Sequence, residues 1–351
     1  MRILHVITSL EIGGAQRLLA DLLPLQSSSA NVCLLVYERV GNDFEKAIEQ
    51  AGIRIICLDE HIFHNPNVVF RMRKIFKDYD VVHAHLFPTI YWASLAARGL
   101  KIKLVYTEHS TSNSRRSKWF FRSIERFMYS RYDKIISISQ QTQDALTSWL
   151  AQHDKRFVVI NNGVNTQKFA SMKVPVIPKS LIMVSRFATS KDQETVIRAM
   201  KQIDKDAILF FVGDGENRPH CEKLAYELGI SDRVHFLGSR SDVAELIAAS
   251  YIGIQSSNWE GFGLTAVEIM ACGKPVIATN VDGLKQVVEG AGEIFALGND
   301  SELASRVNYM LADKEYYHAM SSRCRRRAKE YDISVMSRNY IKLYKALLEN
   351  E

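Results

Sequence analysis

Short apolar runs alternate with amphipathic stretches along the chain. Apolar runs of this length, separated by helical patterns, predict parallel strands joined by crossover helices, which form a doubly wound α/β sheet. The alternation pauses over residues 161–178, where an Asn-Gly turn and two prolines stand in a stretch of weak periodicity. It then restarts, so we predict two Rossmann-like domains, residues 1–165 and 166–332. The predicted strands cover residues 3–8, 32–37, 54–58, 80–84, 103–107, 134–138 and 157–160, and then 181–184, 207–212, 234–237, 252–255, 276–279 and 293–295.

The composition is that of a globular protein with a basic first half. Hydrophobic residues make up 47% of the 351 residues and charged residues 24%, which is usual for a folded domain in water. Residues 1–168 carry 22 Lys and Arg against 15 Asp and Glu, a net charge of +7, whereas the remainder carries 23 against 24. The basic half indicates an anionic partner, such as a membrane surface, a nucleic acid or an anionic substrate.

Several features of the sequence indicate a cytoplasmic protein. No apolar run approaches the ~20 residues of a membrane span, and no signal peptide is recognisable at the start. The five cysteines are scattered and show no Cys-x-x-Cys spacing. This pattern argues for a reducing compartment and against a zinc site or a disulfide scaffold.

The glycine-rich stretch 259–275 combines a loop with the start of a helix. Glu260 precedes Gly261 and Gly263, and Glu268 lies eight positions further on, inside a helix that we expect to start near Gly263. The loop follows a predicted strand, at the end where open α/β sheets bind ligands, and bare amides at a helix amino terminus suit a phosphate. Eight residues span just over two helical turns, so the two carboxylates should contact different parts of one ligand. A structural glycine cluster with one buried glutamate is the alternative.

Two cations follow another predicted strand end. Arg186 and Lys191 lie between strand 181–184 and the next helix, where a guanidinium fork and an ammonium could hold a diphosphate. Two solvated loop charges are the simpler interpretation of this pair alone.

Two glycine loops were compared with the dinucleotide-binding pattern G-x-G-x-x-G. Gly13 and Gly14 follow the first strand and permit close backbone approach to a ligand, or form a purely structural turn. Neither this loop nor Gly213-Asp214-Gly215 fits the pattern, because Arg218 occupies the place of the third glycine in the second loop. A nicotinamide dehydrogenase is therefore disfavoured.

Histidines also lie at predicted strand ends. His109 follows strand 103–107 and is a candidate to contact a substrate hydroxyl, although a structural histidine fits the position equally well. His83 and His85 share one face of their strand, which could suit a metal, but no third ligand is apparent. Two Asp-x-Asp triplets, Asp78–Asp80 and Asp204–Asp206, directly precede strands at the wrong edge of the sheet for a nucleotide-diphosphate metal site. We interpret both as turns and predict no catalytic divalent metal.

A basic and aromatic segment could dock on an anionic membrane. It begins a predicted helix over residues 118–130, and a packed helix with a solvated basic face is the usual alternative. No nucleic-acid-binding module is readable, so nucleic acid is disfavoured. The residues that would make the membrane contact are Arg115, Arg116, Lys118, Trp119 and Arg122.

Residues 256–279 resemble the signature of glycosyltransferase family 4, whose members are retaining enzymes of the GT-B fold. Asp282-Gly283 stands where such chains frequently have two glycines. Shorter matches follow one another in order along the chain: Gly13-Gly14, His85 in Val-Val-His-Ala-His, Thr107-Glu108-His109, Asn162-Gly163-Val164, Ser185-Arg186-Phe187 with Lys191, Val212-Gly213-Asp214-Gly215 and Val234-His235-Phe236-Leu237-Gly238.

The resemblance implies two Rossmann-like domains facing a cleft, with the last helix, residues 333–351, crossing back onto the first domain. It also implies a nucleotide-diphosphate-sugar donor bound mainly by the second domain. Arg186 and Lys191 would hold the diphosphate, Glu268 the ribose hydroxyls, and Glu260 the donor sugar, which His109 would face from the first domain. Further donor contacts are implied for Gly13, Gly14, Phe236, Leu237, Gly261, Phe262, Gly263, Leu264 and Thr265.

We therefore expect a retaining, metal-independent hexosyl- or N-acetylhexosaminyl-transferase that needs no cofactor. Its donor would be a nucleotide sugar, most simply a UDP-sugar, and its acceptor a saccharide or lipid-linked hydroxyl in bacterial surface polysaccharide synthesis, with the enzyme peripheral on the inner membrane face. A nucleotide-sugar epimerase of the same fold and a non-catalytic nucleotide-sugar-binding protein are the alternatives.

Overall fold

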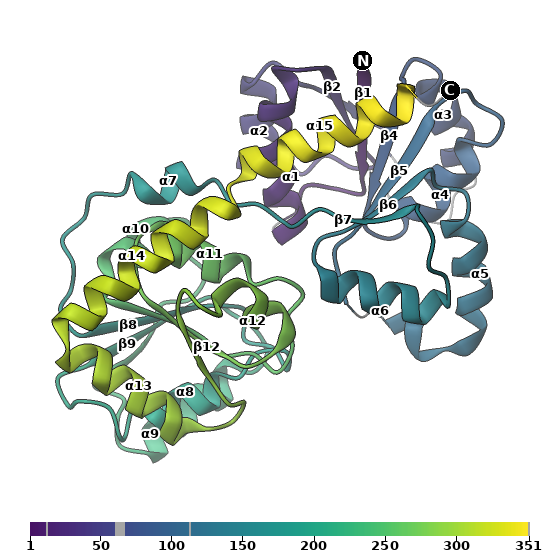
Figure 1. The fold of residues 1–351 in the computed structure, drawn as a ribbon. Helices are drawn as coiled ribbons and strands as arrows, with labels where there is room; N and C mark the ends of the chain where they lie inside the picture. Colours follow the sequence, from purple (N-terminus) through teal and green to yellow (C-terminus); the bar gives the residue numbers. More distant parts are fainter. Residues whose placement is uncertain (12, 60–66, 112–113, 350–351) are drawn as a thin grey trace. The chain divides into compact units, whose positions relative to one another are not determined.

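The computed structural model describes residues 1–11, 13–59, 67–111 and 114–349, and the chain divides into two compact units. Unit 1 comprises Met1–Gly163 together with Ile333–Glu351, and unit 2 comprises Val164–Asp332 (Figure 1). The division falls two residues before the boundary expected from the sequence at residue 165. Within the described residues, no helix is both long enough and apolar enough to cross a bilayer.

Unit 1 is built on a sheet of seven parallel strands in the order β3-β2-β1-β4-β5-β6-β7. The order reverses direction between β1 and β4, as expected for a doubly wound sheet. The strands are β1 (Arg2–Ile7), β2 (Asn31–Val36), β3 (Arg54–Cys57), β4 (Val81–His85), β5 (Lys103–Glu108), β6 (Lys134–Ser137) and β7 (Phe157–Val159).

Helices cover both faces of this sheet (Figure 1). Residues of β1 alternate between two apolar clusters: Ile3 and Ile7 belong to one, and Leu4 and Val6 to the other. This is the period of two expected for a strand buried on both faces. The helices are α1 (Gly14–Ser27), α2 (Asp43–Gln50), α3 (Asn67–Phe76), α4 (Thr89–Ala96), the 3-10 turn η1 (Ser114–Ser117), α5 (Trp119–Tyr129), α6 (Gln140–Leu150) and α15 (Ile333–Glu349).

Unit 2 repeats the same plan with six parallel strands in the order β10-β9-β8-β11-β12-β13. The order reverses between β8 and β11, so the loops that leave these two strands diverge at the carboxyl edge of the sheet. The strands are β8 (Ser180–Val184), β9 (Ile208–Val212), β10 (Val234–Phe236), β11 (Ile252–Gln255), β12 (Val276–Thr279) and β13 (Glu293–Phe295). The prediction of two doubly wound parallel sheets is confirmed.

The helices of unit 2 include two that the sequence analysis missed. Helix α7 (Thr166–Ala170) lies in the predicted linker, and α12 (Asp282–Val288) follows β12. Both are short, so neither displays enough turns for a helical period to stand out. The other helices are α8 (Gln193–Ala199), α9 (Arg218–Glu227), α10 (Val243–Ala249), α11 (Leu264–Ala271), α13 (Asp300–Ala312) and α14 (Lys314–Glu330).

The last two helices belong to different units. Helix α14 packs against α11 in unit 2, whereas α15 packs against α1 in unit 1. Figure 1 shows α15, in yellow, lying along α1. Tyr340 and Tyr344 of α15 are fully buried in unit 1, so the carboxyl-terminal helix is part of the core of the first unit.

Candidate functional site

Glycines allow two loops of unit 2, those after β8 and β9, to pack backbone against backbone. A Cβ added to Gly213 would lie 2.2 Å from the carbonyl oxygen of Ser185, and one added to Gly215 would lie 2.2 Å from that of Phe187. Both glycines have positive φ angles, +130° and +153°, which side chains disfavour. The loop after β9 therefore supports the loop that carries Arg186, and glycine is required for that close approach.

The loop after β8 is also joined to the loop after β11. The amide of Asp192 donates to the carbonyl oxygen of Ser256 at 3.1 Å, and the amide of Asn258 donates to that of Ser190 at 2.9 Å. These backbone bonds cross the point where the strand order reverses. They bring the two predicted cations, Arg186 and Lys191, to the same edge as the glycine-rich stretch.

Lys191 and Glu260 form an ion pair at this edge. The ammonium of Lys191 also donates to Oγ of Ser257 at 3.3 Å. About one fifth of each charged side chain is exposed, 18% for Lys191 and 23% for Glu260. The sequence predicts that these two residues contact different parts of a ligand. In the structure they are direct partners of each other.

Arg186 is held by its backbone and not by its side chain. The carboxamide of Gln193, which is buried, donates to the carbonyl oxygen of Arg186 at 3.0 Å and to Oγ of Ser185 at 3.1 Å. The side chain of Arg186 is exposed. Sequence reasoning missed Gln193, because its role depends on a contact with the loop before its own helix.

Gly263 marks the start of α11. Its φ and ψ angles of 88° and 47° are left-handed, and none of the described side chains caps the helix. Helix amino termini without a capping side chain leave amides that can bind an anion. Helix α11 begins at Leu264, which confirms the start predicted near Gly263. Glu268 lies on its second turn and is buried.

Other predicted donor contacts are placed mainly by packing. The ring of Phe262 is buried edge-on against Tyr331, with ring centroids 5.2 Å apart, so its backbone is the part available to a ligand. Phe236 stacks on Phe211 at 5.3 Å, and the amide of Leu237 donates to the carbonyl oxygen of Phe211 at 2.9 Å. In unit 1, Gly13 caps α1 with extended backbone, and Gly14 is its first residue.

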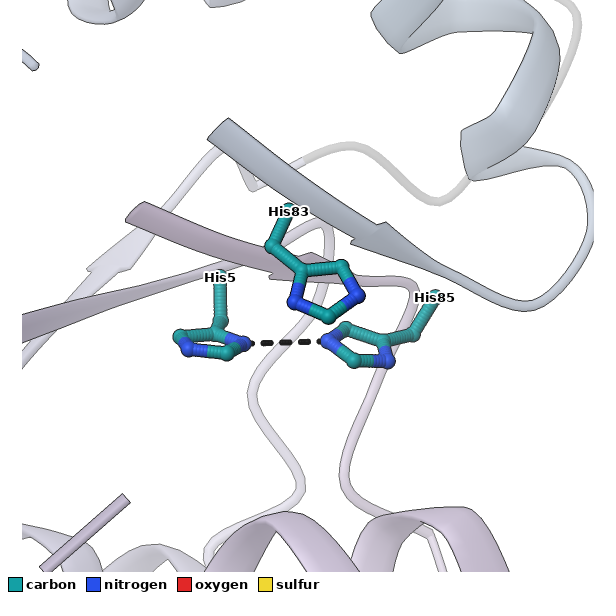
Figure 2. A group of neighbouring side chains, drawn as sticks. All are labelled: His5, His83 and His85. Carbon is teal, nitrogen blue, oxygen red and sulfur yellow. Dashed lines mark hydrogen bonds between the residues drawn. The ribbon is translucent and has the colours of Figure 1, made fainter. Parts of the chain in front are cut away.

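Unit 1 contains a buried row of histidines. His5 on β1 lies directly opposite His83 on β4 in the sheet register, and His85 follows two residues later on the same face. Figure 2 shows the three rings close together, with a hydrogen bond between His5 and His85. His5 supplies a third imidazole beside His83 and His85, so the expectation that no third ligand is present was wrong.

The ring nitrogens of these three histidines are already engaged. His5 bonds to Gln26 at 2.8 Å and to His85 at 3.0 Å, and His85 bonds also to His109 at 3.2 Å. His83 bonds to the hydroxyl of Tyr344 and, at 2.7 Å, to that of Thr107. A metal bound by all three imidazoles would have to displace one hydrogen bond from each ring. The geometry therefore favours a hydrogen-bonded cluster over a metal centre.

Burial keeps the imidazoles neutral. Desolvation lowers the pKa of His5 and that of His109 to about 4. It also lowers the pKa values of His83 and His85 well below their usual range, with a smaller contribution from the neighbouring histidines. At neutral pH each ring therefore has one donor and one acceptor nitrogen.

Two of the five residues predicted to contact a membrane, Arg115 and Arg116, point inward, so the prediction was wrong for these two. Arg115 pairs with buried Glu125 at 2.8 Å, and Arg116 pairs with buried Glu108 at 3.1 Å. Their side chains are 17% and 9% exposed. A buried carboxylate needs a partner. Glu125 lies seven residues beyond Lys118, and the sequence does not indicate that it is buried.

The two Asp-x-Asp triplets are engaged by cations of the protein. Asp80 accepts from the guanidinium of Arg2 at 2.9 Å and from the Arg2 amide at 2.7 Å. Lys179 donates to Asp204 at 2.8 Å and to Asp206 at 2.9 Å. These contacts are those of turns braced by ion pairs.

Comparison with known proteins identifies the class. The Anabaena protein HepE, whose structure was solved with UDP and glucose, has the same architecture. It superposes on this chain with a TM-score of 0.86 and is 22% identical; the match covers 99% of this chain and all of HepE. The fold is therefore GT-B, the architecture of many nucleotide-sugar-dependent glycosyltransferases.

The sequence comparisons define the family. The family description "Glycosyltransferase Family 4" matches residues 12–168 and "Glycosyl transferases group 1" matches residues 165–327. The chain is 30% identical to N-acetyl-alpha-D-glucosaminyl L-malate synthase of Bacillus anthracis, over 70% of this chain and 69% of that protein. It is 24% identical to UDP-Gal:alpha-D-GlcNAc-diphosphoundecaprenol alpha-1,3-galactosyltransferase of Escherichia coli, over 93% and 91%. The chain belongs to the group 1 glycosyltransferases, family 4, and is a nucleotide-sugar glycosyltransferase.

We predict that Gly283→Ala destabilises the site of unit 2. The new Cβ would lie 2.2 Å from the carbonyl oxygen of Glu260, and backbone on both sides must shift, which we expect to lower the free energy of unfolding by about 1–3 kcal/mol. Urea unfolding measures this. Gly13→Ala is the control, because its new Cβ meets the flexible end of Gln16. Equal stability of the two variants would contradict the prediction.

The histidine cluster predicts a loss of stability in acid. Below pH 6.5 the unfolded histidines bind protons, whereas folded His5 and His109 do so only near pH 4. The free energy of unfolding should therefore fall as the pH is lowered from 6.5 to 4. Urea unfolding at a series of pH values gives the slope of the free energy of unfolding against pH. This slope should be smaller for His85→Phe and unchanged for His153→Gln, a control at an exposed position. A flat profile in the wild type would refute this.

Proposed function

We propose that this protein is a retaining, metal-independent glycosyltransferase that moves a hexose or N-acetylhexosamine from a UDP-sugar to a hydroxyl group. The observation that carries the proposal is the Lys191–Glu260 pair at the strand-order reversal of unit 2. Arg186 lies on the same loop as Lys191, and the start of α11 follows Glu260 closely. Cations and free amides at that edge suit a diphosphate. That HepE is described in complex with UDP and with UDP-glucose supports the choice of nucleotide.

In the proposed reaction the two cations do the work of a metal. Arg186 and Lys191 neutralise the charge that develops on the leaving diphosphate, an electrostatic contribution that is usually large. Glu268 accepts from the ribose hydroxyls, and the backbone near Phe236 and Leu237 flanks the base. The acceptor hydroxyl attacks from the face that the diphosphate leaves, and the departing phosphate takes its proton, so the anomeric configuration is retained.

In this mechanism the diphosphate competes with Glu260 for the ammonium group of Lys191. Lys191 is paired with Glu260, so a diphosphate that binds the ammonium must share it with this carboxylate or replace it. Glu260 would then be released toward the sugar. Donor binding would thus place the carboxylate and the ammonium on neighbouring parts of the same ligand.

Substitution of the cations tests the donor site. We expect Arg186→Ala and Lys191→Ala each to lower the turnover by about 10²–10³-fold, the usual cost of losing one transition-state charge partner. Turnover is measured with a panel of UDP-sugars and saccharide or lipid-linked acceptors. Arg198→Ala is the matched control, because Arg198 lies on α8 of the same unit and its side chain is half exposed.

The same assay distinguishes the alternatives. Near-wild-type turnover in Lys191→Ala, or complete loss of activity with EDTA, would refute the proposed mechanism. Isomerised donor without transfer would identify an epimerase, and donor binding without turnover would identify a binding protein.

We also propose that α5 contacts an anionic membrane, on which a lipid-linked acceptor would be found; the acceptor of the Escherichia coli relative is a diphosphoundecaprenol. The support is an exposed apolar stripe on that helix: Trp119 is 83% exposed and Phe127 55%, and Phe120 and Ile124 are exposed between them. Lys118, Arg122 and Arg126 flank the stripe and are exposed. Aromatic side chains between basic ones suit the interface of an anionic bilayer. The contact would place the protein on the inner face of the membrane.

The membrane contact predicts a difference between two exposed aromatic residues. Trp119→Ser should reduce co-sedimentation with vesicles of anionic phospholipid, because it removes the most exposed ring of the stripe. Tyr226→Ser is the control, since Tyr226 is comparably exposed but lies on α9 of unit 2. Binding that is insensitive to salt, or equal in both variants, would contradict the proposal.

A further inference from the structure

Four side chains of unit 1 form a continuous hydrogen-bonded chain that ends at His109. Oε1 of Gln26 on α1 lies 2.8 Å from Nε2 of His5, Nδ1 of His5 lies 3.0 Å from Nε2 of His85, and Nδ1 of His85 lies 3.2 Å from Nε2 of His109. Gln26, His5 and His85 are buried, whereas His109 is partly exposed. The chain therefore leads from the packed interior to the candidate substrate residue.

Gln26, the first member of this hydrogen-bonded row, determines which nitrogen of each histidine carries a proton. An amide oxygen can only accept, so Nε2 of His5 must donate to Gln26 and Nδ1 of His5 must accept. His85 then donates from Nε2 and accepts at Nδ1. His109 in turn donates from Nε2, which leaves its Nδ1 without a proton.

The chain works in this way only while the rings are neutral. A doubly protonated ring at His5 or His85 would point one N–H at another N–H. Burial prevents this at neutral pH, because it holds the pKa of His5 at about 4 and that of His85 well below its usual range. The directions of the three hydrogen bonds are therefore coupled.

His83 belongs to a separate branch of the cluster. Its nitrogens bond to Tyr344 and to Thr107, and the Thr107 hydroxyl lies 3.2 Å from that of Tyr340. Its ring contacts that of His85, with centroids 4.2 Å apart, through packing. Substitutions in this branch disturb the same core but leave the direction of the Gln26–His109 chain unchanged.

We propose that Gln26, His5 and His85 are positioning residues that hold His109 in the tautomer with Nδ1 unprotonated, where it accepts a hydrogen bond from a sugar hydroxyl. Nδ1 of His109 has no hydrogen-bond partner within the described part of the chain, so it is available to a ligand. The inference rests on the proposed function in one respect, the contact between His109 and a hydroxyl of the donor or acceptor sugar.

The hydrogen-bonded row from Gln26 to His109 is unsuited to carrying a proton away from His109. A proton placed on Nδ1 of His109 could pass along the rings as far as Nε2 of His5, but the carboxamide of Gln26 neither takes up a proton readily nor passes one on. A proton would therefore travel no further than His5, the ring that donates to Gln26. The role that remains is orientation, which agrees with a leaving phosphate acting as the base.

Nuclear magnetic resonance of the ¹⁵N-histidine-labelled full chain reads the tautomers directly. We expect His5, His85 and His109 each to show a protonated Nε2 and a bare Nδ1 at pH 7. A protonated Nδ1 on His109 would overturn the proposal, since it requires the Gln26 amide to be turned around. Simultaneous broadening of His5, His83 and His85 by one equivalent of zinc would also overturn it, by showing a metal site.

Two variants connect the tautomer to turnover. Gln26→Leu removes the acceptor that sets the direction, so the three rings should populate both tautomers and kcat should fall about tenfold, the effect of one hydrogen bond. Its affinity for UDP should be unchanged. Tyr340→Phe is the control, because it removes a hydroxyl from the His83 branch of the same core. Equal kcat in the two variants would overturn the proposal.

The two readouts separate this inference from the proposed function. Expected tautomers together with a fall in kcat in Gln26→Leu support both. Expected tautomers without any glycosyl transfer by the wild type would refute the proposed function and the role of His109 in it. Reversed tautomers in an active enzyme would refute the positioning role alone.

Discussion

The site of unit 2 depends on backbone contacts that glycine makes possible. The loops after β8 and β9 can approach each other because Gly213 and Gly215 lie against the carbonyl groups of Ser185 and Phe187. Backbone hydrogen bonds join the loop after β11 to the loop after β8. Gly283 in α12 does the same for the carbonyl group of Glu260. Once these loops are together, Lys191 and Glu260 meet, and the amino terminus of α11 lies at the same sheet edge. The charged site is thus a consequence of backbone packing.

The family signature of this chain acquires a physical meaning from these contacts. Residues of this signature also determine the backbone conformation and packing of the protein itself. Gly263 has the left-handed conformation that starts α11, and Asp282-Gly283 retains the glycine that approaches Glu260 while replacing its neighbour. A chain that changes Gly283 should therefore lose the loop geometry, whereas one that changes Asp282 need not.

Much of the fold could be predicted from the sequence. The alternation of strands and helices predicted both doubly wound sheets, and the last helix begins at Ile333 as expected. Helices α7 and α12 were missed because helices of five and seven residues show no clear period. Arg115 and Arg116 appeared to be solvent-facing, because the sequence does not show that Glu125 and Glu108 are buried partners.

Long-range partners were the harder part of both candidate sites. His83 and His85 stood out as alternate residues of one strand, but His5 joins them only because β1 pairs with β4 in this register. Lys191 and Glu260 are 69 residues apart, and their pairing depends on the order of β8 and β11 in the sheet. Local spacing predicts which residue types gather at a strand end, whereas strand order decides which of them touch.

A crystal structure of the full chain with bound UDP would test the central claim most directly. The account predicts that the diphosphate lies at the amino terminus of α11, with the ammonium of Lys191 moved from Glu260 to a phosphate oxygen and Glu268 at the ribose. UDP bound elsewhere, with the Lys191–Glu260 pair intact, would contradict the account.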